Sequence, residues 1–170
     1  MNKLELYLDM DGVFVNFEKG VRDLCGFDFS TTTDKGLIWK KINKAATFWA
    51  QLEWLPDGPE LWNTIRANQQ AFHSIQMLTG WPVGDQKGIR EKTEWVHREM
   101  RKMPVIVTKR KDKAQYADSN SILIDDHPEN IEMWTEKGGI GILHVNALQT
   151  TAELQRIIVE HAKNQLADRL

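Results

Sequence analysis

The stretch LELYLDMDGV, residues 4–13, places a short apolar strand directly before two aspartates and a glycine. Side chains of a strand point alternately to opposite faces, so Asp9 and Asp11 can serve one site only if the chain bends there. Gly12 permits such a bend. Two carboxylates this close repel each other unless a cation or a proton lies between them. Asp and Gly are also ordinary turn residues, so the rest of the sequence has to decide between a turn and a site.

Short apolar stretches alternate with segments of helical periodicity along the rest of the chain. We predict strands at 4–8, 73–78, 104–107, 121–124 and 140–145. We predict helices at 14–24, 37–52, 59–68, 84–102, 128–137 and 150–167, with Asp57 and Thr150 or Thr151 as caps of two of them. This alternation is typical of an α/β fold with a central parallel sheet flanked by helices.

Polar side chains follow three of the predicted strands. Asp9 and Asp11 follow the first strand, Thr79 follows the second, and Asp125 and Asp126 follow the fourth. In a parallel sheet the ligand lies beyond the carboxyl ends of the strands, so we expect these residues to converge on one edge. Isolated turns would not require that convergence, and the sequence therefore favours a site.

Four aspartates at one edge cannot all be ionised without countercharge. Mg²⁺ is a hard cation that prefers oxygen ligands and suits a site that also binds phosphate. Lys92 and Lys113 lie in segments that can reach the same edge. With one Mg²⁺ and these two lysines the site is neutral, which would allow a dianionic phosphate to enter without large repulsion.

Composition sets the broad class of the protein. A chain of 170 residues suits one domain with a small insertion. A net charge of −2 gives no broad footprint for a long nucleic acid or a membrane. Cys25 is the single cysteine, so no intramolecular disulfide forms, and a buried structural thiol is expected. Neither a signal peptide nor an apolar run of membrane-spanning length is evident, so we expect a cytoplasmic protein.

Four segments together resemble the motifs of the haloacid dehalogenase-like phosphatases. They are Asp9–Val13, Leu78–Gly80, the lysines, and Ile124–Asp126. Within that superfamily the chain resembles the 5'(3')-deoxyribonucleotidases. The closer likeness lies in residues 9–13, 52–58, 91–96 and 112–126.

The resemblance implies a role for each aspartate. Asp9 would be the nucleophile that forms an aspartyl-phosphate, and Asp11 the general acid and base. Mg²⁺ would be held by the side chains of Asp9 and Asp125 and by the main-chain carbonyl of Asp11. Asp126 would support the ion from behind these ligands or through a water molecule.

The resemblance also implies phosphate contacts. Thr79 would offer its hydroxyl and Gly80 its backbone N–H, although the deoxyribonucleotidases usually have a serine at the second position. Lys92 lies thirteen residues after Thr79, as in that family, and would add a contact. A solvated helix lysine is an equal alternative for Lys92.

One further lysine would neutralise charge beside the nucleophile. Lys113 matches this position best, but its spacing to Asp125 is two residues longer than the family pattern. Lys109 and Lys111 are therefore rival candidates.

An insertion after the first strand resembles a small helical cap. We predict a catalytic core of residues 1–13 and 55–170 and a cap of residues 14–54. Eight of the fifteen aromatic residues lie in the cap. Most of them would form its own core, whereas four are candidates for the wall of a substrate pocket: Phe17, Trp39, Phe48 and Trp49.

The sequence therefore predicts a magnesium-dependent phosphatase that hydrolyses (deoxy)nucleoside 5'-monophosphates. Its partner would be a small phosphate monoester, and a homodimer is compatible with the sequence. One alternative is a phosphatase for another small ester, such as a sugar phosphate, or for a polynucleotide 3'-phosphate. A nucleotide-binding regulatory protein on the same fold is a second alternative, which the presence of both Asp9 and Asp11 disfavours.

Overall fold

A computed structural model describes residues 3–81 and 86–167 of the chain. The described residues form five strands: β1 (Leu4–Leu8), β2 (Phe72–Gly80), β3 (Val105–Thr108), β4 (Ser121–Asp125) and β5 (Ile140–Leu143). Each lies within a few residues of its predicted range. All the pairings are parallel, so the predicted α/β class is confirmed.

The strands follow the order β3-β2-β1-β4-β5, which puts β1 at the centre of the sheet. Leu8 is level with Met77 of β2 on one side and with Ile124 of β4 on the other. The carboxyl ends of the three central strands therefore lie side by side. Residues that follow β1 and β4 meet at this edge.

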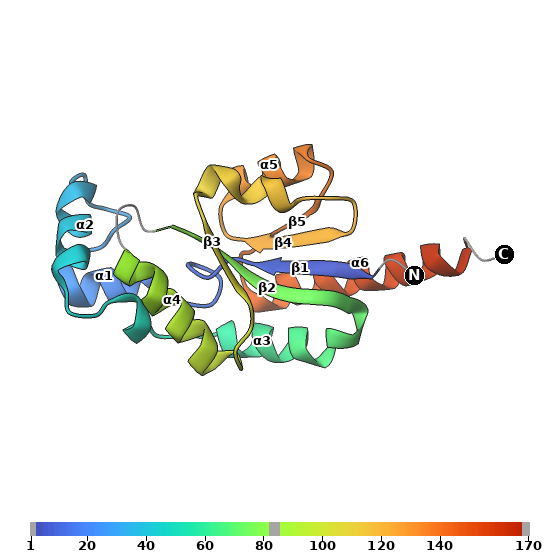
Figure 1. Cartoon of the computed structure of the whole chain (residues 1–170), viewed down its shortest axis with the longest axis horizontal. Coiled ribbons are helices and arrows are strands. Elements are labelled where there is room, and N and C mark those ends of the chain that lie inside the picture. Colours follow the sequence, from blue (N-terminus) through green and yellow to red (C-terminus); the bar gives the residue numbers. More distant parts are fainter. Residues whose placement is uncertain (1–2, 82–85, 168–170) are drawn as a thin grey trace.

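Helices cover the sheet on both faces. The α-helices are α1 (Phe17–Cys25), α2 (Lys35–Lys44), α3 (Gly58–Ala67), α4 (Gln86–Glu99), α5 (Pro128–Glu136) and α6 (Ala147–Ala167). Three 3₁₀ helices are η1 (Trp49–Gln51), η2 (Gln69–Ala71) and η3 (Arg110–Tyr116). Figure 1 shows α5 on one face of the sheet, α3, α4 and α6 toward the other, and α1 and α2 set apart at one end.

Alternating side chains of the strands supply two apolar layers. In β1, Leu6 and Leu8 belong to the larger core, whereas Tyr7 points to a smaller cluster with Leu123 and Trp134. This two-sided burial explains why β3, β4 and β5 are largely apolar. β2 is the exception, because it also carries His73, Ser74 and Gln76.

The predicted helix over residues 37–52 is wrong, because the chain breaks into two elements. Helix α2 begins two residues earlier, after Asp34 caps it by accepting a hydrogen bond from the Leu37 N–H, and ends at Lys44. Ala45 is extended, and the short helix η1 follows. The first two residues of the helix predicted from Gly84 lie outside the described residues, and the described part begins at Gln86.

Two predicted caps have other roles. The Asp57 side chain makes no capping bond to α3 and instead accepts a hydrogen bond from the N–H of Ala147, at the start of α6. Thr150 lies inside α6, where its hydroxyl contacts Nδ1 of His144 at 2.8 Å. Asn146 caps α6 by accepting from the Gln149 N–H.

Residues 14–54 leave and rejoin the sheet region at neighbouring points. Val15 pairs with Trp54 in an antiparallel bridge, and the Leu55 N–H donates to the carbonyl of Phe14 at 2.7 Å. Helices α1 and α2 lie between these two points, at the left of Figure 1. The division into cap and core stays a prediction. Among the described residues, no helix is both long enough and apolar enough to span a membrane.

Candidate active site

The end of β1 delivers Asp9 to the carboxyl edge of the sheet. The backbone N–H of Asp9 donates to the carbonyl of Ile124 at 2.9 Å, which continues the pairing of β1 with β4. Asp9 is only 4% exposed. Its position is therefore fixed by the centre of the sheet rather than by a mobile loop.

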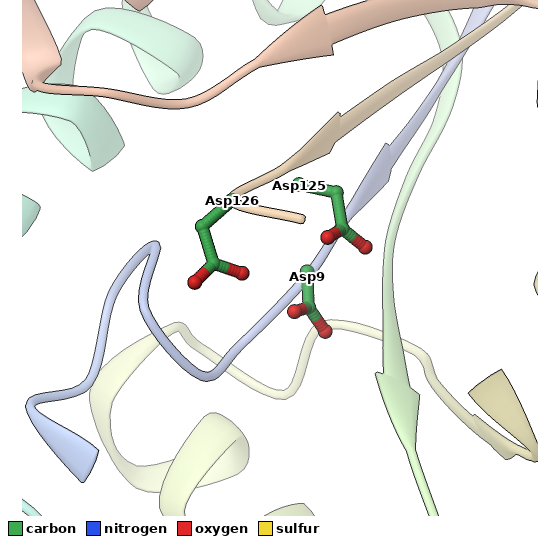
Figure 2. A group of neighbouring side chains, drawn as sticks. All are labelled: Asp9, Asp125 and Asp126. Carbon is green, nitrogen blue, oxygen red and sulfur yellow. The ribbon is translucent and has the colours of Figure 1, made fainter. Parts of the chain in front are cut away.

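Three carboxylates gather at this edge. Asp9, Asp125 and Asp126 each offer an oxygen, and these atoms lie within 4.8 Å of one another. Figure 2 shows the three side chains at the ends of their two strands. The predicted convergence of the first and fourth strands is thus present.

Gly12 is required at its position for two reasons. Its φ of +75° is unfavourable for any residue with a Cβ. A Cβ built there would also lie 2.2 Å from Oδ2 of Asp126. The bend after β1 therefore allows the Asp126 carboxylate to lie against the backbone of residue 12.

Lys113, on η3, is the lysine that the structure places among the carboxylates. Its Nζ lies 2.8 Å from Oδ1 of Asp9 and 2.7 Å from Oδ2 of Asp125, and the lysine is 3% exposed. Lys109 and Lys111 are exposed. The extra length between Lys113 and Asp125 is taken up by η3 and the following loop.

Asn130 is a site residue that the sequence analysis missed. Its Nδ2 lies 2.9 Å and 2.8 Å from the two oxygens of Asp125. The His127 N–H donates to Oδ1 of the same carboxylate at 2.9 Å. As predicted, His127 and Pro128 open the following helix, α5, and an asparagine in its first turn was the available signal.

A second buried lysine, Lys92, contacts the other half of the site. Its Nζ donates to Oδ2 of Asp11 at 2.5 Å, to Oγ1 of Thr79 at 3.0 Å, and to the carbonyl of Gly80 at 3.1 Å. The lysine is 1% exposed, so it is not the solvated helix lysine of the alternative interpretation. A Cβ at Gly80 would meet nothing within 4 Å, so the site has room for a larger residue there.

Burial and repulsion between carboxylates raise the pKa values of Asp11, Asp125 and Asp126. Burial raises the pKa of Asp126 to about 6, and the charge of Asp9 adds to the effect. Burial also raises the pKa of Asp11, against the opposing charge of Lys92. Burial disfavours the charged form of Lys113, but the carboxylates of Asp9 and Asp125 outweigh it and raise the pKa of this lysine.

The donor set fits a divalent cation. Oδ1 of Asp11 and Oδ1 of Asp126 are buried and accept no hydrogen bond from any described residue. Buried carboxylate oxygens without a partner are costly unless an ion or a proton satisfies them. Oxygen donors of this kind are the ligands that Mg²⁺ prefers.

A cavity of about 460 Å³ adjoins Asp11 and Asp126. Four aromatic side chains line it: Phe17, Phe29, Trp39 and Trp49. Its polar lining includes Arg110 and His127. An apolar wall with a few polar groups is typical of a site for a small organic molecule.

Phe48 does not line this cavity, contrary to the pocket that we predicted from the sequence. It is buried behind the wall, with its ring 6.0 Å from that of Phe17 and 5.0 Å from that of Trp49. Phe29 takes a place in the wall that the sequence analysis did not assign. Ring positions of this kind depend on packing between segments, which helical spacing alone does not show.

Arg110 was also missed. Its Nε donates to Oδ1 of Asn130 at 3.0 Å, and its Nη2 donates to Glu129 at 2.9 Å. These bonds hold the guanidinium at the edge of the cavity. The signal available was the basic run at residues 109–113, in which the sequence analysis assigns a role only to lysines.

No protein-family model and no curated protein matches the chain. Several solved structures do match the chain. A hydrolase from Streptococcus pneumoniae has 14% sequence identity and a TM-score of 0.56, over 91% of this chain and 100% of its own. A hydrolase of the haloacid dehalogenase-like family from the same organism has 13% identity and a TM-score of 0.54, over 83% of this chain and 84% of its own.

A third similar structure comes from Lactobacillus plantarum and is provisionally described as a phosphoglycolate phosphatase. It has 14% identity and a TM-score of 0.50, and the match covers 88% of this chain and 89% of that one. At such identities the likeness concerns the fold. The chain therefore shares its fold with hydrolases of the haloacid dehalogenase superfamily.

Proposed function

We propose that this protein is a magnesium-dependent phosphatase that hydrolyses (deoxy)nucleoside 5'-monophosphates through an aspartyl-phosphate. The observation that carries the proposal is the cluster of Asp9, Asp125 and Asp126 beside an aromatic cavity that Asp11 also lines. The fold shared with haloacid dehalogenase-like hydrolases supports the same reaction class.

In the first step, an Asp9 carboxylate oxygen attacks phosphorus as the bond to the leaving oxygen breaks. Lys113 lies 2.8 Å from Oδ1 of Asp9 and brings a positive charge next to the proposed nucleophile. Asp11 donates a proton to the leaving oxygen. Burial raises the pKa of Asp11, which is the direction that favours a proton donor.

In the second step, Asp11 takes a proton from a water molecule, whose oxygen attacks phosphorus and releases Asp9 and inorganic phosphate. Lys92 and Thr79, which contact each other beside Asp11, would bind phosphate oxygens in both steps. The side chains of Asp9 and Asp125, with the Asp11 carbonyl, would hold Mg²⁺, and Asp126, which lies close to both carboxylates, would support the ion directly or through a water molecule. Bound there, the ion supplies positive charge that offsets the charge of the phosphoryl group.

The aromatic wall favours a nucleoside as the leaving group. Stacking on flat rings is worth roughly 1–3 kcal/mol per base and needs no particular hydrogen-bond pattern. A second candidate is a small phosphorylated acid or sugar. Arg110 at the cavity edge favours it, because a guanidinium would pair with a carboxylate on the leaving group.

Phosphate release from nucleoside 5'-monophosphates, sugar phosphates and phosphoglycolate, with Mg²⁺ and with a chelator, tests the proposal. We expect Mg²⁺-dependent turnover, greatest for a nucleotide. Asp9→Asn should lower turnover by at least about 10⁴-fold, as removal of a nucleophile does. Exposed Asp23→Asn is the matched control and should retain full turnover. Failure to hydrolyse any ester would refute the proposed activity, and an active Asp9→Asn would refute the nucleophile.

A further inference from the structure

Glu91, on α4, is a buried carboxylate whose partner lies in the cap region. Its Oε2 accepts hydrogen bonds from the backbone N–H groups of Phe48 and Trp49, both at 2.8 Å. Glu91 is 7% exposed. Because a buried carboxylate is costly without donors, these two bonds fix the start of η1 against α4.

The same face of α4 also makes hydrogen bonds to the residues that follow η1. Nε1 of Trp95 donates to the carbonyl of Leu52 at 2.8 Å, and Nε1 of Trp54 donates to Oε2 of Glu99 at 3.0 Å. Glu91, Trp95 and Glu99 are spaced by four residues, so they form one row along the helix. The row contacts successive parts of residues 48–54.

Lys92, the residue after Glu91, joins this row to the candidate active site. Its Nζ lies 4.3 Å from the centre of the Trp49 ring, and the same ammonium group contacts Asp11 and Thr79. The Trp49 ring is also part of the cavity wall. The hydrogen bonds that the Glu91 carboxylate accepts from the backbone of Phe48 and Trp49 therefore determine where the Trp49 ring meets Lys92.

We propose that Glu91 is a positioning residue that holds Trp49 against Lys92 and so sets the wall of the leaving-group cavity. The proposal rests on the proposed function for its effect on catalysis, but the contacts stand without it. Glu91 does not line the cavity, and its Oε2 accepts from the two N–H groups. Its influence on the reaction passes through Trp49.

Hydrogen exchange at the amides of Phe48 and Trp49 tests the contact directly and needs no substrate. Glu91→Ala should accelerate exchange at these two amides by about 10- to 100-fold, because a charge-assisted acceptor is lost. Glu94 lies on the same helix and is exposed, so Glu94→Ala is the matched control and should change nothing. Unchanged protection in Glu91→Ala would overturn the proposal.

Glu91→Gln is the conservative variant, because it keeps an acceptor oxygen but removes the charge. We expect a smaller acceleration of exchange, about threefold to tenfold. This variant also serves if Glu91→Ala does not fold. If the amides of Phe48 and Trp49 exchanged at wild-type rates in Glu91→Gln, the charged carboxylate would not be what holds them.

Kinetics test the route through Trp49. With a nucleoside 5'-monophosphate, Glu91→Ala should raise KM by about tenfold, whereas kcat with phenyl phosphate should stay within about threefold. In a Trp49→Ala background, Glu91→Ala should raise KM by a further factor of less than about two. If the two substitutions instead raised KM independently, so that their effects multiplied, Glu91 would not act through Trp49. If no ester is hydrolysed at all, the proposed function fails, and the exchange experiment still decides the position of Trp49.

Discussion

The carboxyl edge of the sheet and the aromatic wall of the cavity are built in different ways. At the sheet edge, Asp9 follows β1 and Asp125 ends the adjacent strand β4, and Lys113 bridges the two carboxylates. At the wall, Phe17 and Trp49 belong to two separate elements and meet only by packing, with ring centres 5.5 Å apart.

We infer from this difference that the sheet edge carries out the chemistry and that the cavity wall recognises the substrate. Backbone pairing between the strands holds the charged side chains within hydrogen-bond distance of one another. A reaction centre needs positions that are fixed this closely. The cavity wall depends on side-chain packing and on a few long-range bonds, such as those of Glu91. We expect changes at the sheet edge to affect turnover and stability together, and changes at the wall to affect substrate selection.

The largest expected effect on stability comes from Lys113→Met, which leaves two buried carboxylates without their cation. We expect turnover to fall by about 10²–10³-fold. The free energy of unfolding should fall by about 3–5 kcal/mol without metal, as for a broken buried ion pair. Added Mg²⁺ should restore part of the loss, because it binds the folded state. The exposed Lys111→Met should stay within about 0.5 kcal/mol of wild type in chemical denaturation, and equal losses in both variants would contradict the assignment.

Gly12→Ala tests how closely the backbone must approach the acidic cluster. Both the positive φ and the 2.2 Å approach to Asp126 oppose a Cβ, so we expect a loss of about 3 kcal/mol in unfolding free energy and weaker Mg²⁺ binding. Gly138 also has a positive φ, of +90°, but no atom lies within 4 Å of its added Cβ. Gly138→Ala should therefore cost only about 1 kcal/mol and leave Mg²⁺ affinity, measured by calorimetry, unchanged.

Trp39→Ala addresses the cavity wall alone. Trp39 lines the cavity yet is 37% exposed, so its removal should cost little stability. We expect KM for a nucleotide to rise by about tenfold, with kcat nearly constant, because one stacking surface is lost. Trp62, on α3, lies outside this cavity, and Trp62→Ala is the control for loss of an indole. If Trp39→Ala instead lowered turnover at saturating substrate by about a hundredfold, the wall would take part in the chemistry.

The smallest expected effect is at His144, whose backbone N–H donates to the Asp125 carbonyl at 2.9 Å but whose ring contacts Thr150 of α6. Burial lowers the pKa of His144, against the opposing charge of Asp57. The unfolded chain therefore binds a proton more readily than the folded one, and this term removes stability as the pH falls below about 6.5. Buried acids such as Asp126, whose pKa is raised, contribute with the opposite sign. The unfolding free energy of His144→Gln should consequently fall less than that of wild type between pH 7 and pH 5; parallel curves would contradict this.

The sequence predicted the sheet and its acidic edge because the signals are local. Each strand is an apolar run, and in β1 and β4 that run changes abruptly to acidic residues. Parallel pairing then places these residues together without further information. Asp9, Asp125 and Lys113 could be selected on this basis, although the rival lysines required the structure.

Features set by distant residues could not be predicted. The position of Phe48 depends on Glu91, which is more than forty positions away. Asp57 leaves α3 uncapped because it binds the N–H of Ala147, ninety positions later. Helix propensity and capping rules describe neighbours along the chain, and these contacts join parts of the chain that meet only in the folded protein.

The central position of β1 has a consequence for the order in which the protein forms during synthesis. β1 is made first, but its neighbour β4 begins only at Ser121. At roughly 5–20 residues per second, more than about five seconds separate the synthesis of Asp9 from that of Asp125. Throughout that interval the nascent chain carries an apolar strand that lacks at least one of its two partners. The acidic cluster thus comes into existence only after β4 has been made.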